Sequence, residues 1–369
     1  MALLPTGLEA MVASGRDDAD DDDAGNKGPA VHTRQGGVPM RVVITGGAGF
    51  LGGMLARALI VRGTLTGPTG AQEPIDSIAL LDAVGPAAEA DVHPSVVSVI
   101  GDIGDAELVR SVVDRDDVSV FHLASMVSAG SELDFDRALR VNVGGATAVL
   151  EACRARGSTP RFVFSSSIVA FGGIGVDEVV SDETKLTPET TYGTTKAICE
   201  LLVNDYTRKG FVDGRSARLP TVVIRPGQPN AAASSWVSGI FREPLNGIEC
   251  VVPVEVDMHV PIAGYRTVIE NLIRLHEVDG ALLGSDRALN LPALDPTPGE
   301  MSAALGRASD RPLGTISYEI DPLISAFFRG WAQHSSFGRA EALGFVRDVD
   351  LESIITGYIE DFLSSSGPR

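Results

Sequence analysis

The sequence predicts an α/β fold, in which a doubly wound parallel sheet carries a smaller, discontinuous lobe. Two observations lead to this fold class. From Met40 onward, short apolar segments alternate with helix-length segments, and the short segments are apolar throughout. Strands of that kind form parallel sheets that are covered on both faces. The alternation weakens after Arg225, so the remaining residues are expected to form a lobe over the carboxyl ends of the strands.

The predicted elements follow in chain order. Runs rich in Val, Ile and Leu indicate strands at residues 41–45, 77–82, 96–100, 119–123, 161–165, 221–225 and 288–291. Apolar residues at helical spacing indicate helices at residues 49–62, 105–114, 135–156, 191–209 and 266–278. The lobe is expected to contribute further helices at residues 299–307, 322–330 and 351–362.

An acidic block precedes the first strand. Residues 1–39 hold seven acids and three bases, with the acids in one run and no hydrophobic period. Such a block is expected to be disordered and solvated, and an acidic docking tail is the alternative. We expect the physiological start at Met40. The predicted domains are therefore a disordered tail at 1–39, a sheet domain at 40–225 plus about 262–294, and a lobe at 226–261 plus about 295–369.

Composition excludes several classes of protein. The chain has 369 residues, and 49 Asp and Glu against 30 Lys and Arg give a net charge of −19. That charge repels nucleic acid and anionic membrane surfaces, so small molecules or further copies of the chain are the expected partners. Three cysteines and six histidines lack the spacing of metal ligands, and we predict no metal. Without a signal-peptide or membrane-span pattern, a cytoplasmic protein is expected.

A glycine-rich turn follows the first strand. Residues 41–45 lead into Gly46, and Gly49, Phe50, Leu51 and Gly52 then open a helix. Glycines at this spacing permit a tight turn, close approach of a pyrophosphate and close helix–strand packing. The pattern alone is weak, but its place between the first strand and the first helix predicts a dinucleotide. We therefore expect an NAD-binding Rossmann domain and a substrate-binding lobe.

An acidic residue closes the second predicted strand. Asp82 is placed to accept hydrogen bonds from the adenosine ribose hydroxyls and to repel a 2′-phosphate. An ordinary aspartate at a strand-end turn is the alternative. Together with the glycines, Asp82 favours NAD over NADP.

The candidate catalytic residues are Ser167, Tyr192 and Lys196. Tyr192 and Lys196 are four residues apart on a predicted helix and share one face, while Ser167 follows the preceding long strand. A phenol is a base at neutral pH only where a cation stabilises its phenolate, so Lys196 is expected to lower the pKa of Tyr192. Ser167 is expected to hold the reacting oxygen.

These motifs resemble those of extended short-chain dehydrogenases/reductases. The glycine turn, Gly101-Asp102-Ile103, His122-Leu123-Ala124, Val141-Asn142, the serine cluster and Tyr192-xxx-Lys196 stand in the order of that family, over nearly all of residues 40–363. The resemblance implies a Rossmann domain, a Ser/Tyr/Lys triad, and a cofactor contacted by Asp102, Ile103, Leu123, Ala124, Asn142, Tyr192 and Lys196. By the same resemblance, Asn142 is expected to hold an active-site water or backbone that supports Lys196, and a buried residue that satisfies a strand end is the alternative.

A narrower resemblance is to the D-erythronate dehydrogenases. It rests on the runs at residues 192–214, 218–221, 225–235 and 239–247. It implies NAD-dependent oxidation of D-erythronate, a four-carbon sugar acid, at C2 to 2-oxo-D-erythronate. Two positions depart from the family pattern: Gln228 stands where a lysine is usual, and Gly264-Tyr265 stands where Ser-Pro is usual. A lysine missing from the pocket would affect the choice of acid.

A carboxylate substrate calls for a basic pocket in this acidic chain. Arg225, Arg242 and Arg266 are the candidates, because an arginine binds a carboxylate through two parallel hydrogen bonds. A strand end, a pair with Glu243 and a solvated helix position are their respective alternatives. The remaining predicted substrate contacts are Ser167, Tyr192, Asn230, Ser234 and Ser235.

Two other functions compete with this one. A nucleotide-sugar epimerase or dehydratase on the same fold would need a larger pocket. A non-catalytic dinucleotide sensor would have no use for Ser167, Tyr192 and Lys196 together. The helices at 135–156 and 191–209 carry apolar residues that, by resemblance, pair with their copies in a four-helix homodimer interface.

Overall fold

A parallel sheet organises the molecule. The computed structural model describes residues 39–85, 93–173, 179–228 and 234–364, so the predicted acidic tail falls almost wholly outside the described residues. The strands follow the order β4, β3, β1, β5, β6, β8 and β12, and all of these pairs are parallel. In that order their bounds are Val96–Ile100, Gln72–Asp82, Met40–Thr45, Val118–His122, Arg161–Ser167, Asp213–Leu219 and Ala288–Asn290. The short β2 (Thr64–Thr66) pairs antiparallel to the start of β3.

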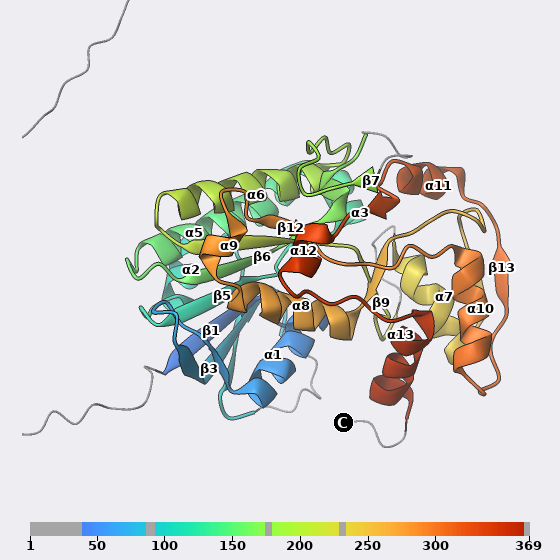
Figure 1. Ribbon diagram of the computed structural model, residues 1–369, viewed down its shortest axis with the longest axis horizontal. Coiled ribbons are helices and arrows are strands. Elements are labelled where there is room, and N and C mark those ends of the chain that lie inside the picture. Colours follow the sequence, from blue (N-terminus) through green and yellow to red (C-terminus); the bar gives the residue numbers. More distant parts are fainter. Residues whose placement is uncertain (1–38, 86–92, 174–178, 229–233, 365–369) are drawn as a thin grey trace, which may run out of the picture. The chain divides into compact units, whose positions relative to one another are not determined.

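Helices cover both faces of this sheet (Figure 1). On one face lie α1 (Phe50–Arg62) and α8 (Tyr265–Glu277), and on the other lie α2 (Ala106–Val112), α5 (Gly145–Arg154) and α6 (Thr191–Arg208). Alternate residues of β1 supply the two cores: Val42 and Ile44 pack toward α1 and α8, while Val43 packs toward α2 and α5. Because successive side chains of a strand point to opposite faces, this split confirms the predicted doubly wound α/β fold.

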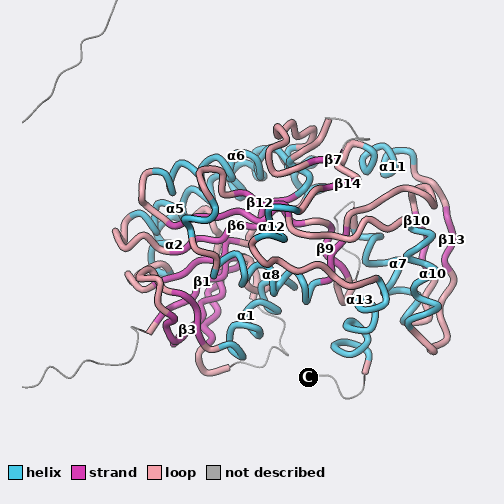
Figure 2. The backbone as a smooth tube through the Cα atoms, in the orientation of Figure 1, coloured by secondary structure: helices cyan, strands magenta, loops and turns pink. Residues whose placement is uncertain are grey.

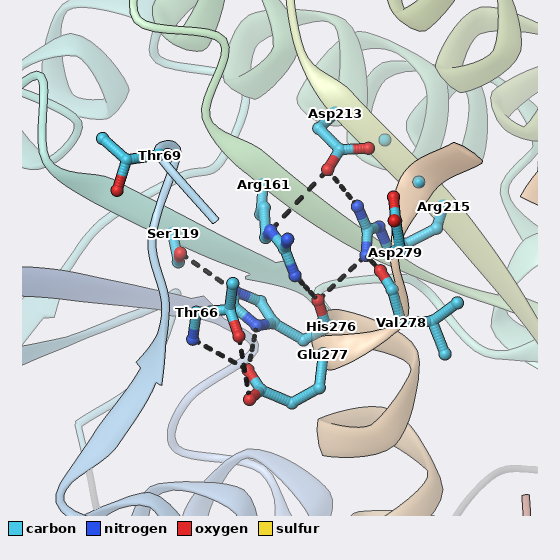
Figure 3. A network of polar contacts seen from close by, with 12 residues as sticks. Thr66, Thr69, Ser119, Arg161, Asp213, Arg215, His276, Glu277, Val278 and Asp279 are labelled. Carbon is cyan, nitrogen blue, oxygen red and sulfur yellow. Dashed lines mark hydrogen bonds and ion pairs between the residues drawn. The ribbon is translucent and has the colours of Figure 1, made fainter. Parts of the chain in front are cut away.

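One central strand of the sheet was not predicted. The sixth strand was expected at residues 221–225, whereas the sheet uses β8 there. β9 (Thr221–Val223) instead pairs with β11 (Ile262–Gly264) outside the main sheet. β8 carries Asp213, Arg215 and Arg218, which suggest an exposed segment. Both arginines are in fact buried. Figure 3 shows Asp213 and Arg215 held within a network of polar contacts.

The predicted helix at residues 135–156 is interrupted. After the short α3 (Ser128–Leu133), α4 (Phe135–Ala138) leads into a π-helical turn at Leu139–Gly144, and α5 continues from there. A π-helical turn inserts a residue into the helical ladder and is frequent at functional sites. Asn142 lies in this turn and is buried.

Several elements after β9 share a further hydrophobic core. Figure 2 shows the helices and strands that contribute to it. Its elements are α7 (Ser235–Leu245), β10 (Cys250–Val252), α10 (Pro298–Ala308), β13 (Ile316–Tyr318), α11 (Pro322–Arg329) and α13 (Leu351–Tyr358), followed by a π-helical turn at Ile359–Leu363. α7 was not predicted, because Ser, Gly and Pro dominate the stretch around it. Division of the chain into a sheet domain and a lobe remains a prediction.

The remaining short elements connect these layers. They are a 3-10 turn at Ile168–Ala170, β7 (Val179–Val180), α9 (Gly280–Leu283), β14 (His334–Ser335) and α12 (Gly338–Ala342). Among the described helices, none has the length and apolar character that crossing a membrane requires.

Candidate active site

A cavity of about 360 Å³ opens at the carboxyl ends of the strands. Its wall combines the glycine turn after β1, the end of β6, the start of α6, the loop after β9 and the start of α7. The predicted residues that line it are Gly46, Gly49, Phe50, Leu51, Gly52, Leu123, Ser167, Tyr192, Lys196, Arg225, Ser234, Ser235 and Arg242. The structure thus brings together the cofactor turn, the triad and two of the three arginines.

The glycine turn has the geometry of a dinucleotide cradle. Gly46 has φ of +72°, in the left-handed region that favours glycine. A Cβ at Gly52 would lie 2.3 Å from the carbonyl oxygen of Gly46, so only glycine fits where α1 meets the turn. Gly49 precedes α1 without a side-chain cap, which leaves the first N–H groups of a 13-residue helix for phosphates. These residues fit NAD.

Asp82 lies beside this turn at the end of β3. Its Oδ2 accepts a hydrogen bond from the N–H of Ala48 at 3.1 Å, and its Oδ1 accepts one from Val84 at 3.3 Å. The carboxylate therefore fastens the glycine turn to the strand next to it. This is the position from which a carboxylate reaches an adenosine ribose.

The other predicted cofactor residues take different places. Asp102 is exposed and accepts a hydrogen bond from the N–H of Gly104 at 2.8 Å. Ile103 is buried against α5, where it contacts Gly145. The N–H of Ala124 donates to Thr45 Oγ1 at 3.2 Å, which ties the loop after β5 to the end of β1.

Asn142 contacts protein rather than open space. Its Oδ1 accepts from the N–H of Met126 at 2.7 Å, and its Nδ2 donates to Thr195 Oγ1 at 3.0 Å. Thr195 in turn donates to the carbonyl oxygen of Tyr192 at 2.8 Å. In this structure Asn142 therefore positions α6, the helix that carries Tyr192 and Lys196.

The catalytic candidates meet where α6 crosses the end of β6. Thr190 caps α6 by accepting a hydrogen bond from the N–H of Gly193 at 3.0 Å, which fixes the first turn and Tyr192 with it. Lys196 follows one turn later, is buried, and donates from Nζ to the carbonyl oxygen of Ser165 at 2.7 Å. Its Nζ also lies 5.4 Å from the centroid of the Tyr192 ring.

Electrostatics of the triad differ from the expectation. Desolvation raises the pKa of Tyr192 to about 12, and a hydrogen bond from Ser167 opposes that shift. Desolvation likewise lowers the pKa of Lys196 to about 8, while Cys199 and Glu200 oppose it. The expected lowering of the Tyr192 pKa is therefore outweighed by burial, because the phenolate loses more solvation here than the neighbouring groups restore.

Comparison with known proteins identifies the family. The model of the 3-beta hydroxysteroid dehydrogenase/isomerase family matches residues 43–228. The D-erythronate dehydrogenase of Cupriavidus necator is 43% identical over 323 residues, 87% of this chain and 98% of that protein. The D-erythronate dehydrogenase of Haemophilus influenzae is 39% identical, over 87% of this chain and 99% of its own.

The chain belongs to the D-erythronate dehydrogenase family. It is therefore an NAD-dependent oxidoreductase of the extended short-chain dehydrogenase/reductase type, with NAD as its cofactor. Its fold agrees with a solved nucleoside-diphosphate-sugar epimerase from Agrobacterium tumefaciens, with a TM-score of 0.81 and 38% identity over 88% of this chain and 95% of that one.

Within this family member, Arg225 and Arg242 stand together at the cavity. Arg225 is partly buried, and its Nη1 donates to the carbonyl oxygen of Gln228 at 3.0 Å. Arg242 is buried, with Nη1 on the carbonyl oxygen of Arg225 at 2.8 Å and Nη2 on Glu243 at 2.6 Å. Arg242 thus holds the backbone of Arg225, whereas Arg225 has no carboxylate partner among the described residues.

The third predicted arginine is placed elsewhere. Arg266 is half exposed, and its guanidinium contacts Asp361 at 2.6 and 2.9 Å and Glu360 at 2.8 Å. It does not line the cavity. The sequence could not show this separation, because both acids follow Arg266 by more than 90 residues. Asn230 lies outside the described residues.

Several residues at the cavity were not predicted. Ser238 accepts a hydrogen bond from the N–H of Arg225 at 3.1 Å, so two side chains of α7 hold this one arginine. Trp331, which follows α11, lines the cavity and packs edge-to-face on Phe327 and at a tilt against Phe328. No local motif marks either residue. No cluster of three or more potential metal ligands occurs in the part of the chain that the structure describes.

Proposed function

We propose that this chain oxidises D-erythronate at C2 to 2-oxo-D-erythronate, with Ser167, Tyr192 and Lys196 as the catalytic residues. The observation that carries the proposal is the 43% identity to a D-erythronate dehydrogenase over 98% of that relative. The shared cavity of the glycine turn, the triad and Arg225 supports it independently.

The residues of the chain supply the proton chemistry. The Tyr192 phenolate takes the proton of the C2 hydroxyl, and Ser167 donates a hydrogen bond to the same oxygen as it becomes a carbonyl. Gly46, Gly49, Gly52 and Asp82 would hold NAD, which when bound would supply the acceptor for the hydride at C2. The proton then passes from Tyr192 to solvent, so the alcohol loses a hydride and a proton.

Lys196 is the group that favours ionisation of Tyr192 to the phenolate. Burial raises the pKa of Tyr192 to about 12, so ionisation near neutral pH needs a cation close by. The Lys196 ammonium lies 5.4 Å from the Tyr192 ring centroid and stabilises the charged form.

Arg225 is the proposed ligand of the substrate carboxylate. It lines the cavity, and its guanidinium donors meet no acidic side chain of the described residues. A bidentate pair with a carboxylate satisfies such a guanidinium. Arg242 acts through Arg225, because its own guanidinium is bound to Glu243 and to the Arg225 carbonyl.

The test is NAD reduction over a panel of four- to six-carbon aldonates. We expect D-erythronate to give the highest kcat/KM, and a product that condenses with o-phenylenediamine, as 2-oxo acids do. A product that instead loses carbon dioxide on warming would place the oxidation at C3 and contradict the proposal. NADP as the preferred acceptor would contradict the role of Asp82.

A nucleotide-sugar substrate is the second candidate. The epimerase from Agrobacterium tumefaciens, 38% identical to this chain, favours it by name. Thermal stabilisation by a UDP-sugar but not by erythronate, with turnover of the UDP-sugar, would replace our proposal with this one.

We also infer a homodimer through α5 and α6. Val149 and Leu150 on α5 are buried in the chain's own core, whereas Leu201 on α6 is 67% exposed. Leu133 and Phe135, which precede α5 in the chain, are exposed as well. Sedimentation equilibrium of wild type and Leu201→Glu checks this inference, and a monomeric wild type would overturn it.

A further inference from the structure

A buried polar cluster lies directly behind the triad. Arg218 on β8 and Glu200 on α6 form a pair, with Arg218 Nη2 at 2.8 Å from Oε2 and Nε at 3.0 and 3.2 Å from the two carboxylate oxygens. Each side chain is only 3% exposed. Arg218 also donates to the carbonyl oxygen of Asp182 at 3.1 Å, and its guanidinium lies 4.9 Å from the Phe171 ring centroid.

Glu200 continues the catalytic face of α6. Tyr192, Lys196 and Glu200 are spaced by four residues, so they occupy successive turns of one helix face. The end of β6 supplies one partner to each turn. Ser167 hydrogen-bonds to Tyr192, the Ser165 carbonyl accepts from Lys196 at 2.7 Å, and Ser166 Oγ donates to Glu200 at 2.5 Å.

This arrangement makes Glu200 a tie between the two catalytic elements. Ser166 immediately precedes Ser167, and it is also the register partner of Arg218 across β6 and β8. Glu200 on α6 therefore accepts a hydrogen bond from Ser166 at the end of β6, and Arg218 on the neighbouring strand β8 forms an ion pair with Glu200. Losing either side chain leaves a buried charge without its partner.

The Glu200–Arg218 pair also affects which group the Lys196 ammonium contacts. A carboxylate one turn away would attract the ammonium, yet both Glu200 oxygens are occupied by Arg218 and Ser166. The Lys196 Nζ instead donates to a neutral carbonyl and stays beside the phenol.

We propose that the Glu200–Arg218 pair is a positioning element for the reaction. It holds the Ser166–Ser167 end of β6 against α6, and the mutual neutralisation of its two charges leaves the Lys196 ammonium available to Tyr192. This inference rests on the catalytic roles given to Ser167, Tyr192 and Lys196 in the proposed function.

The titratable and charged groups around Lys196 are Cys199 and Glu200 on α6, His122 on β5, Arg218 on β8, Asp182 ahead of α6, and Arg225 and Arg242 on the cavity wall. Burial raises the pKa of Cys199 to about 11 and lowers that of His122 to about 3, so both are neutral. Burial raises the pKa of Asp182 as well. Glu200 and Arg218 are thus the charged pair whose separate removal is informative.

The experiment follows the side-chain NMR titration of Lys196, one of four lysines, in the enzyme without substrate. Glu200→Gln leaves the Arg218 charge unopposed, so we expect the pKa of Lys196 to fall by about one unit from its value of about 8. Arg218→Met leaves Glu200 unopposed, and we expect a rise of about one unit. The double variant Glu200→Gln/Arg218→Met restores neutrality, so its titration is expected to return to that of the wild type.

Controls separate electrostatics from folding. Arg215→Met removes an equally buried arginine from the same strand and should leave the Lys196 titration unchanged. The acidic limb of the kcat/KM profile should move in the same directions as the titration. Unchanged titrations, or shifts of one sign in both single variants, would overturn the proposal. If Arg218→Met does not fold, the Lys196 pKa of Glu200→Gln is compared with that of the double variant, and equal values in the two would overturn the proposal. Because the titration needs no substrate, a wrong substrate assignment would leave this test intact.

Discussion

Arg215 and Arg218 are three residues apart on β8, so their side chains point to opposite faces of the sheet. Arg215 lies toward the amino ends of the parallel strands, called here the amino edge, and Arg218 lies toward their carboxyl ends, the carboxyl edge. Arg215 Nη1 donates to the carbonyl oxygens of Leu275, His276 and Val278, at 2.9 Å each, and so satisfies the end of α8. Arg218 binds the side chain of Glu200 on α6. Both arginines are buried and both pair with an acid, but their partners differ in kind.

The amino edge of the sheet is a closed network (Figure 3). Asp213 pairs with Arg215, Arg161 and Arg287, and Arg161 also donates to the carbonyl oxygen of His276. Backbone carbonyls are the main acceptors here, and the last carbonyls of a helix otherwise lack partners. This network therefore stabilises the fold and does not face the cavity.

The carboxyl edge uses the same residue types for another purpose. Arg218 and Glu200 back the residues that line the cavity, because parallel strands direct their carboxyl ends toward the ligand crevice. Burial and pairing alone therefore do not distinguish an arginine that stabilises the fold from one that supports chemistry. The position along the strand does.

Tyr192→Phe is expected to have the largest effect at the carboxyl edge. Loss of the proton acceptor should lower kcat by about 10²–10⁴-fold, while NAD affinity and the free energy of unfolding stay near wild type. Steady-state kinetics and a cofactor fluorescence titration measure the two. Tyr206→Phe, whose hydroxyl contacts Glu151 far from the cavity, is the matched control. A Tyr192→Phe enzyme with wild-type turnover would remove Tyr192 from the mechanism.

Arg215→Met tests the amino edge. The change orphans the carbonyls at the end of α8 and removes one partner of a buried pair, so the free energy of unfolding should fall by about 3–5 kcal/mol. Urea denaturation measures this loss. We expect kcat/KM of the folded variant to stay within about twofold of wild type, since no reacting group moves. A large loss of kcat/KM with intact stability would erase the distinction between the two edges.

Acid should weaken the amino edge through His276. This residue is buried between Ser119 and Glu277, and burial lowers its pKa from 6.5 to about 4. Below pH 6.5 the unfolded chain binds a proton that the folded chain does not. Stability is therefore full above pH 6.5 and falls as the pH drops toward about 4, by about 3 kcal/mol from this group.

Denaturation series with wild type and His276→Gln isolate this contribution. In the variant, the free energy of unfolding should depend less steeply on pH, because the contribution of His276 is gone. His122, whose pKa is lowered to about 3, should still contribute to the pH dependence in both proteins. Equal slopes in the two proteins would show that His276 does not titrate as its burial implies.

Arg225→Ala is expected to have the smallest of these effects. Losing a charge-assisted contact to the substrate carboxylate should raise KM about 10- to 100-fold with a smaller change in kcat. Arg266→Ala, which breaks surface contacts to Glu360 and Asp361, should change kcat/KM by less than about twofold. The reverse ranking of the two variants would assign the carboxylate to Arg266, as the sequence also allowed.

Local sequence signals were enough to single out candidates that the fold brings together. Gly46, Gly49 and Gly52 and the pair Tyr192 and Lys196 are recognised from a few neighbouring residues each, and these five residues line one cavity. Their roles stay a prediction. The contacts of Asn142 could not be read from the sequence, since its partners Met126 and Thr195 lie 16 and 53 residues away. Nothing in the sequence favoured one of Arg225, Arg242 and Arg266 as the carboxylate ligand. Their contacts in the folded protein distinguish them, because Arg225 and Arg242 line the cavity and Arg266 pairs with Glu360 and Asp361.

By itself, the sequence determined the doubly wound sheet, the glycine turn and the face shared by Tyr192 and Lys196, because these follow from apolar periodicity and short-range geometry. Only the tertiary structure decided that the polar segment at residues 213–219 is a central strand. A buried arginine is stable only where carboxylates and carbonyls surround it. Arg215 pairs with Asp213 on its own strand, but its carbonyl partners lie at the end of α8, about 60 residues further along the chain. The carboxylate partner of Arg218 is Glu200 on α6. The pair behind the triad, Glu200 and Arg218, exists for that reason only in the folded protein.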